Sequence, residues 1–177
     1  MNKKLVEYGI HNERSDLRAH VCVEAKKVYV YPTASGLAAI EKEKFPVGNA
    51  YQSVNGNKVK TGIGFLVPPR VIDGCRQVEV PDDWWWIQKF SPSDTTTLKG
   101  KKAVWIIGAL MKQGRFPFPC KPEVIEDLDL QVNGLDIIVA MNTRVQVKCD
   151  YYGGPKKFGG TGNLFLQTHE CNPLGKH

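Results

Sequence analysis

The chain has 177 residues, of which 42% are hydrophobic and 24% are charged, and its formal net charge is +6. This composition is typical of a folded protein with a substantial hydrophobic core, and it excludes an intrinsically disordered chain. The length fits one domain, or a core with a sizeable extension. The excess of positive charge favours a polyanionic partner, and nucleic acid is the first candidate.

Cellular location can also be predicted from the composition. No apolar run approaches the length of a membrane-spanning helix, so no membrane partner is expected. The N-terminal residues 1–7 lack the apolar segment of a signal peptide. The cysteines are odd in number, scattered and never spaced C-x-x-C, which favours reduced thiols. They are Cys22, Cys75, Cys120, Cys149 and Cys171. These features predict a cytoplasmic protein.

The first half of the chain is rich in strand signals. Alternation of apolar and polar residues from about His20 to Tyr31 predicts a strand pair, and residues 34–44 are expected to form a short helix. Residues 47–82 are predicted to be an all-β insertion, because Asn55-Gly56 between two alternating runs is a strong hairpin signal. This insertion could contact DNA, but covering the core is the favoured interpretation.

A run of three tryptophans, Trp84 to Trp86, has the most unusual local composition in the chain. Three consecutive residues cannot share one face of a strand, so at least one is expected at the surface or between elements. Packing against the core is favoured over stacking on an unpaired nucleobase. Residues 91–97 resemble a linker. They mark the predicted boundary between a β-rich N-terminal portion, residues 1–90, and a core, residues 91–177.

The segment from Leu98 to Gln113 is predicted to be a helix buried against a sheet, because its apolar residues cover more than half of the helix circumference. Lys99, Lys101 and Lys102 lie in its first turn, where the helix dipole disfavours cations. A bound phosphate would relieve this conflict. The equally weighted alternative is that the lysines are exposed and are tolerated at modest cost.

Two strand-like runs, residues 135–140 and 144–150, are joined by a short polar turn. The two-residue period of the second run puts Gln146 and Lys148 on one face. Antiparallel pairing of the runs would bring the carboxylate of Asp136 beside them. Such a set suits phosphodiester hydrolysis, because Mg²⁺ prefers oxygen ligands and a lysine can orient the attacking water.

The spacing of these residues resembles the signature of the PD-(D/E)xK nuclease superfamily in a Q-x-K form. Asp136 is followed, after nine residues, by Gln146-Val147-Lys148, and the resemblance covers about residues 98–170. It implies an α/β (α+β) fold with a restriction-endonuclease-like core, a mixed sheet and a flanking helix. It also implies a DNA endonuclease that requires Mg²⁺ or Mn²⁺, with Asp136 and Gln146 as metal ligands and Lys148 orienting the water.

Three features depart from the family pattern. Gln146 occupies the position of the usual acid, the predicted helix Leu98 to Gln113 contains no acid, and a glycine-rich segment follows the Q-x-K strand where a helix is usual. These departures keep two alternatives open. One is a non-catalytic nucleic-acid-binding protein on a decayed nuclease-like scaffold. The other is an interaction protein of a virus or mobile element.

The last part of the chain contributes further candidates. Lys156 and Lys157 lie in the glycine-rich segment, just after the Q-x-K strand, where a substrate backbone would pass. Together with the lysines at the start of the long helix, they are the predicted nucleic-acid contacts. Residues 163–170 are expected to form a closing strand that brings Gln167 and His169 near the site. The oligomeric state is open, and a homodimer is one of the alternatives.

Overall fold

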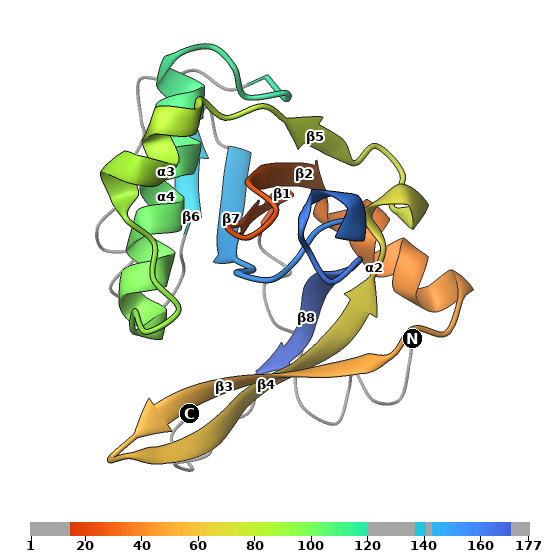
Figure 1. Cartoon of the computed structure of the whole chain (residues 1–177). Helices are drawn as coiled ribbons and strands as arrows, with labels where there is room; N and C mark the ends of the chain where they lie inside the picture. Colours follow the sequence, from red (N-terminus) through yellow and green to blue (C-terminus); the bar gives the residue numbers. More distant parts are fainter. Residues whose placement is uncertain (1–14, 120–136, 141–142, 171–177) are drawn as a thin grey trace.

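The computed structural model describes residues 15–119, 137–140 and 143–170 (Figure 1). Within these residues the fold is α+β, with a five-stranded mixed sheet, a three-stranded antiparallel sheet and three α-helices. The α+β class expected from the sequence is therefore confirmed. In the described part of the chain, no helix is long and apolar enough to cross a membrane.

The five-stranded sheet is assembled from distant parts of the chain, in the order β5-β2-β1-β7-β6. The strands are β1 (Leu17–Cys22), β2 (Lys27–Pro32), β5 (Arg76–Val78), β6 (Ile137–Ala140) and β7 (Thr143–Cys149). β1 lies at the centre, antiparallel to β2 and parallel to β7. Strands from both sides of the predicted boundary at residues 91–97 therefore belong to one sheet.

The expected antiparallel pairing around the polar turn is confirmed for β6 and β7. Ile137 is opposite Gln146, and Ala140 is opposite Thr143. Asp136 lies outside the described residues, so its location beside Gln146 and Lys148 stays a prediction.

The second sheet has the order β3-β4-β8 and contains the predicted hairpin. Its strands are β3 (Val47–Val54), β4 (Asn57–Val67) and β8 (Leu164–Glu170). Asn55 and Gly56 join β3 to β4 with φ angles of 50° and 78°, the left-handed conformation that a two-residue hairpin turn requires. Figure 1 shows the β3–β4 ribbon extending away from the body of the fold.

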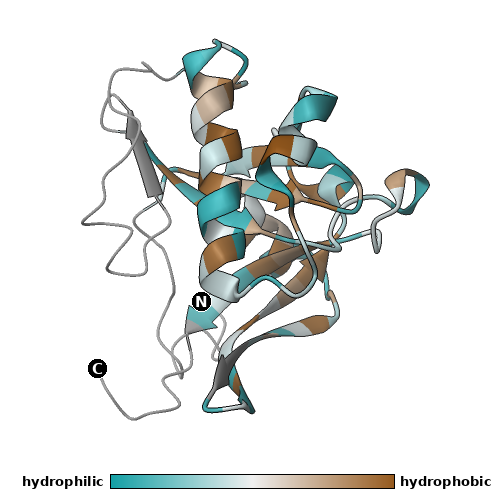
Figure 2. Cartoon of the chain, turned by 60° about the vertical axis from the view of Figure 1, so that its left-hand side comes forward, coloured by the Kyte–Doolittle hydropathy of each residue, from teal (hydrophilic) through white to brown (hydrophobic). Residues whose placement is uncertain are grey.

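The helices pack on the five-stranded sheet from two sides. α4 (Thr96–Lys112) and the short α3 (Asp82–Gln88) lie on one side, and α2 (Thr33–Lys42) lies on the other (Figure 1). The hydroxyl of Thr95 caps α4 by accepting a hydrogen bond from the Leu98 N–H at 3.2 Å. Figure 2 shows hydrophobic and hydrophilic residues interspersed along α4, as expected for a helix buried on one side.

The tryptophan run lies in the middle of α3. At 100° per residue, three successive helical side chains point in different directions, so Trp84 and Trp85 are buried while Trp86 is 75% exposed. The rings of Trp84 and Trp105 of α4 meet edge to face at a centroid distance of 5.7 Å. Core packing is therefore the role of the first two tryptophans, and the third is at the surface.

Both faces of the central sheet are covered. On one face Ala19 and Val21 of β1 pack with residues of α3 and α4, and on the other Tyr31 of β2 packs with Leu164 and Leu166 of β8. All six residues of β1 are buried as a result. Polar side chains on β1 must therefore find partners inside the protein.

Candidate functional site

Gln146 and Lys148 project from the face of β7 that is directed toward β8. Their neighbours Val145 and Val147 belong to the apolar core beneath α4, so the alternation along β7 puts the two polar side chains on the opposite face. Gln146 is 1% exposed, and Lys148 is half-buried. Lys148 Nζ donates to Gln167 Oε1 of β8 at 3.5 Å.

Strand β1 brings two further polar side chains to the same place. In the parallel register Arg18 is opposite Gln146, and His20 is opposite Lys148. Their exposed fractions are 2% and 1%. We did not predict either residue from the sequence. A signal for them was present in the sequence, because Arg18 and His20 alternate with apolar residues along a strand that is otherwise entirely apolar.

These side chains lie together between the two sheets, and we call them the polar cluster. Its members are Arg18, His20, Tyr31, Gln146, Lys148, Asp150 and Gln167. Arg18 Nη1 donates to the Gln167 carbonyl at 3.0 Å, so the guanidinium joins the two sheets. The expectation that Gln167 lies near Lys148 is thus confirmed.

His20 lies in the middle of a short polar chain. Its Nε2 is 2.7 Å from the hydroxyl of Tyr31, and its Nδ1 is 3.6 Å from Asp150 Oδ2. The same carboxylate oxygen accepts the Phe165 N–H at 2.7 Å. Asp150 is therefore held in place by β8, and it faces the imidazole from the end of β7.

Burial determines the protonation states of His20 and Tyr31. Desolvation lowers the pKa of His20, an effect that the carboxylate of Asp150 opposes and that Arg18 and Lys148 reinforce. Desolvation also raises the pKa of Tyr31, against the influence of Arg18. At neutral pH His20 is a neutral imidazole and Tyr31 a neutral phenol. The charged groups among the described members of the cluster are then two cations and one carboxylate.

The lowered pKa of His20 predicts a pH-dependent stability. Below about pH 6.5 the unfolded chain binds a proton that the buried imidazole does not, so the free energy of unfolding should fall as the pH drops from there toward the folded pKa. Above pH 6.5 this contribution is constant. In His20→Gln the free energy of unfolding should depend less on pH in that window. Urea titrations at several pH values measure both slopes, and parallel profiles would contradict the assignment.

The described part of the polar cluster supplies an incomplete set of ligands for Mg²⁺. Among the described residues, no three His, Cys, Asp or Glu side chains come together in a group that could hold a metal ion. The amide oxygen of Gln146 is a neutral ligand, whereas hard cations are usually bound by at least one carboxylate. Asp150 already accepts a backbone hydrogen bond. A metal site here therefore depends on Asp136, outside the described residues.

Comparison with known proteins adds no relative. No family model, curated protein or solved structure matches this chain. The PD-(D/E)xK interpretation rests on Asp136, Gln146 and Lys148.

Two of the three lysines at the start of α4, Lys99 and Lys102, have hydrogen-bond partners within the protein. Lys102 Nζ donates to Asp94 Oδ2 at 2.6 Å and to the Lys89 carbonyl at 2.9 Å. This interaction lowers the pKa of Asp94. Lys99 Nζ donates to a backbone carbonyl at 3.1 Å, and Lys101 is exposed. The carboxylate of Asp94 thus offsets part of the unfavourable positive charge in the first turn of α4 without a bound phosphate. A nucleic-acid contact by these lysines stays a prediction.

Lys156 and Lys157 lie in a turn of 3₁₀ helix, η2 (Lys156–Phe158), within the loop that follows β7. Both side chains are exposed, and Lys157 Nζ lies 4.8 Å from the centroid of the Phe158 ring. The loop is held by backbone hydrogen bonds, among them Gly154 N–H to the Asn163 carbonyl at 2.9 Å. These lysines are thus displayed on an ordered loop, and their contact with nucleic acid also stays a prediction.

Proposed function

We propose that the protein is a metal-dependent DNA endonuclease that hydrolyses phosphodiester bonds at the polar cluster. The observation that carries this proposal is the arrangement of Gln146, Lys148 and Arg18 on one face of the central sheet, with two cations facing a single described carboxylate. Such a set suits an anionic substrate. The positive net charge of the protein and the Q-x-K pattern favour the phosphodiester of a nucleic acid as that anion.

Burial supports different roles for the two cations. Arg18 is almost fully buried and bonded to the β8 backbone, so its guanidinium is a fixed charge beneath the site. Lys148 is only half-buried, so its ammonium is the one that a substrate can approach. A positioned cation in a partly dry site stabilises the negative charge that develops on the phosphoryl oxygens. Lys148 is accordingly the group that contacts the phosphate or orients the attacking water.

The other titratable members of the cluster are less suited to move protons. Both imidazole nitrogens of His20 face protein groups, Tyr31 on one side and Asp150 on the other, and the ring is buried. His20 is therefore a positioning residue in this proposal. A metal ion held by Asp136 and Gln146 would supply the remaining chemistry, because a bound cation polarises the phosphoryl group and acidifies water.

The proposal is tested by metal binding together with cleavage. Wild-type protein should cleave duplex, single-stranded or branched DNA in Mg²⁺ or Mn²⁺, and calorimetry should detect the metal without DNA. Asp136→Asn should lose both signals and retain DNA affinity, since it removes a ligand charge with little change in shape. A wild-type protein that neither binds metal nor cleaves any of these DNAs would contradict the proposal.

A non-catalytic nucleic-acid-binding protein is the second candidate, and the burial of Gln146 favours it. A side chain that is 1% exposed is also typical of a structural amide. Gln146→Glu separates the two candidates. A working site should retain or gain cleavage when the usual acid is restored. In a structural cluster the same substitution should produce no metal-dependent cleavage and should lower the free energy of unfolding.

A further inference from the structure

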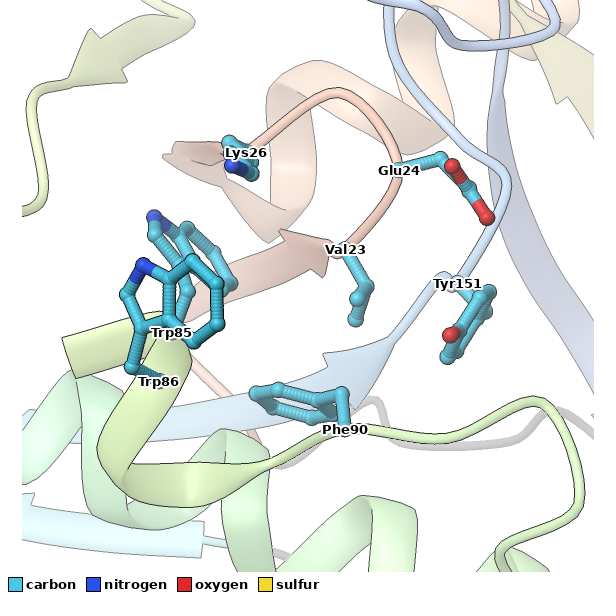
Figure 3. Close-up of a pocket in the computed structure, with 7 residues that line it drawn as sticks. All are labelled: Val23, Glu24, Lys26, Trp85, Trp86, Phe90 and Tyr151. Carbon is cyan, nitrogen blue, oxygen red and sulfur yellow. The ribbon is translucent and has the colours of Figure 1, made fainter. Parts of the chain in front are cut away.

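A pocket of about 260 Å³ opens at one end of the central sheet (Figure 3). Its lining is Val23, Glu24, Lys26, Trp85, Trp86, Phe90 and Tyr151. Figure 3 shows the two tryptophans on one side, Tyr151 on the other, and Phe90 between them at the base. Four of the seven lining residues are therefore aromatic. The volume is below the roughly 300–1,000 Å³ of pockets for drug-sized ligands, so it suits a single small ring system.

The pocket lies where the parallel pair β1 and β7 ends. Just beyond these strands, Glu24 N–H donates to the Tyr151 carbonyl at 3.0 Å, and Asp150 N–H donates to the Val21 carbonyl at 3.0 Å. The carboxyl ends of parallel strands are a common ligand position in open α/β sheets. Two lining residues, Glu24 and Tyr151, are thus held in place by the backbone of the central sheet.

The aromatic wall combines a buried ring, Trp85, with a solvent-exposed ring, Trp86. Trp85 is buried, and its ring lies 6.0 Å from that of Phe90. Trp86 is 75% exposed, although an indole is among the largest apolar side chains that a protein can bury. The pocket therefore offers an exposed π-face beside rings that are already fixed by packing.

The charges around the pocket restrict the ligand. Glu24 is the only acid in the lining and is accompanied by Lys26, while Lys99 Nζ lies 5.0 Å from the centroid of the Tyr151 ring. Lys102 Nζ, paired with Asp94, lies 5.9 Å from the centroid of the Phe90 ring. The three ammonium groups near the aromatic wall disfavour a methylated ammonium ligand, which would need a cation-free cage. They favour a flat ring attached to an anionic chain.

We propose that this aromatic pocket binds an unpaired nucleobase of single-stranded DNA. The base stacks on Trp86, and Lys26 and Lys99 lie where the flanking phosphates pass. This inference deepens the proposed function and rests on it, because it makes DNA with a single-stranded region the substrate class. Tyr151 follows Lys148 by three residues, which span at most about 11 Å, so the pocket begins just beyond the strand that carries Lys148, although Trp85 and Phe90 belong to the α3–α4 side of the sheet and Lys148 projects toward β8.

Binding measured in EDTA tests the pocket without any cleavage. Fluorescence anisotropy would compare labelled oligothymidine with a duplex of equal length, using wild type, Trp86→Ala and the matched control Ile87→Ala. Ile87 is also exposed and lies on the same helix, but it does not line the pocket. Trp86→Ala should weaken single-strand binding by about 5- to 100-fold and should leave duplex binding nearly unchanged. Ile87→Ala should change neither affinity.

An oligomer of abasic sugar phosphates shows whether a base is recognised. Wild type should bind it more weakly than oligothymidine, and Trp86→Ala should cause no further loss, since both changes remove the same stacking contact. Equal wild-type affinity for the two oligomers, equal losses in Trp86→Ala and Ile87→Ala, or no single-strand binding at low salt would each overturn the inference.

The two proposals can fail separately. Single-strand binding that depends on Trp86, in a protein that never cleaves, supports the pocket and contradicts the nuclease. Metal-dependent cleavage with single-strand affinity that is independent of Trp86 supports the nuclease and overturns the pocket.

Discussion

Replacing Lys148 by alanine is expected to reduce the rate of metal-dependent DNA cleavage by about 10²- to 10³-fold, the usual loss when one group that stabilises transition-state charge is removed. The affinity for DNA should change little, because most of it comes from phosphate contacts spread over the surface. Lys148 is half-buried, and its Nζ donates to the neutral amide oxygen of Gln167 at 3.5 Å. The substitution should therefore affect cleavage far more than folding.

Single-turnover cleavage at saturating enzyme separates this effect from binding. Lys112→Ala is the matched control, because it removes the same charge from an exposed position at the end of α4. The control should cleave at the wild-type rate. An unchanged rate in Lys148→Ala, or an equal loss in both variants, would show that Lys148 has no part in the reaction.

Local signals predicted the elements that depend on local contacts. Asn55-Gly56 fixed a hairpin through its backbone conformation, and the apolar periodicity from Leu98 predicted α4 to within two residues. The tryptophan run had a helix-start signal as well, since Pro81 precedes it and two aspartates occupy the first turn. We considered this segment only with strand geometry, in which three consecutive residues cannot share one face.

The polar cluster could not be assembled from the sequence. Arg18 and Gln146 are opposite one another in a parallel pair whose strands are more than a hundred residues apart. Parallel pairing leaves no turn between the strands, so no short-range pattern connects β1 to β7. What the alternation in β7 did predict was that Gln146 and Lys148 share a face. Which side chains lie beside them depended on tertiary structure alone.

Gly64→Ala is expected to lower the free energy of unfolding by about 3 kcal/mol, the upper end of the usual cost of overpacking. Gly64 lies where β4 pairs with β8. An added Cβ would overlap the Leu166 carbonyl and lie 2.7 Å from the Cα of Gln167. Both obstacles are backbone atoms that cannot rotate away, so the strands must separate. β8 also carries the Gln167 carbonyl, which accepts the hydrogen bond from Arg18.

Gly62→Ala is the control for this substitution. Its Cβ would overlap the terminal amide of Gln167, a flexible side chain that can move, and would lie 3.1 Å from the His169 carbonyl oxygen, a much milder approach to the backbone than at Gly64, so its cost should be smaller. Urea unfolding of both variants measures the difference as a shift of the midpoint at constant slope. Gly64 has no positive φ angle, so alanine causes no backbone strain there. A loss of stability seen only in Gly64→Ala must therefore come from the close approach of β8. Equal midpoints for the two variants would mean that β4 and β8 do not pair in this register.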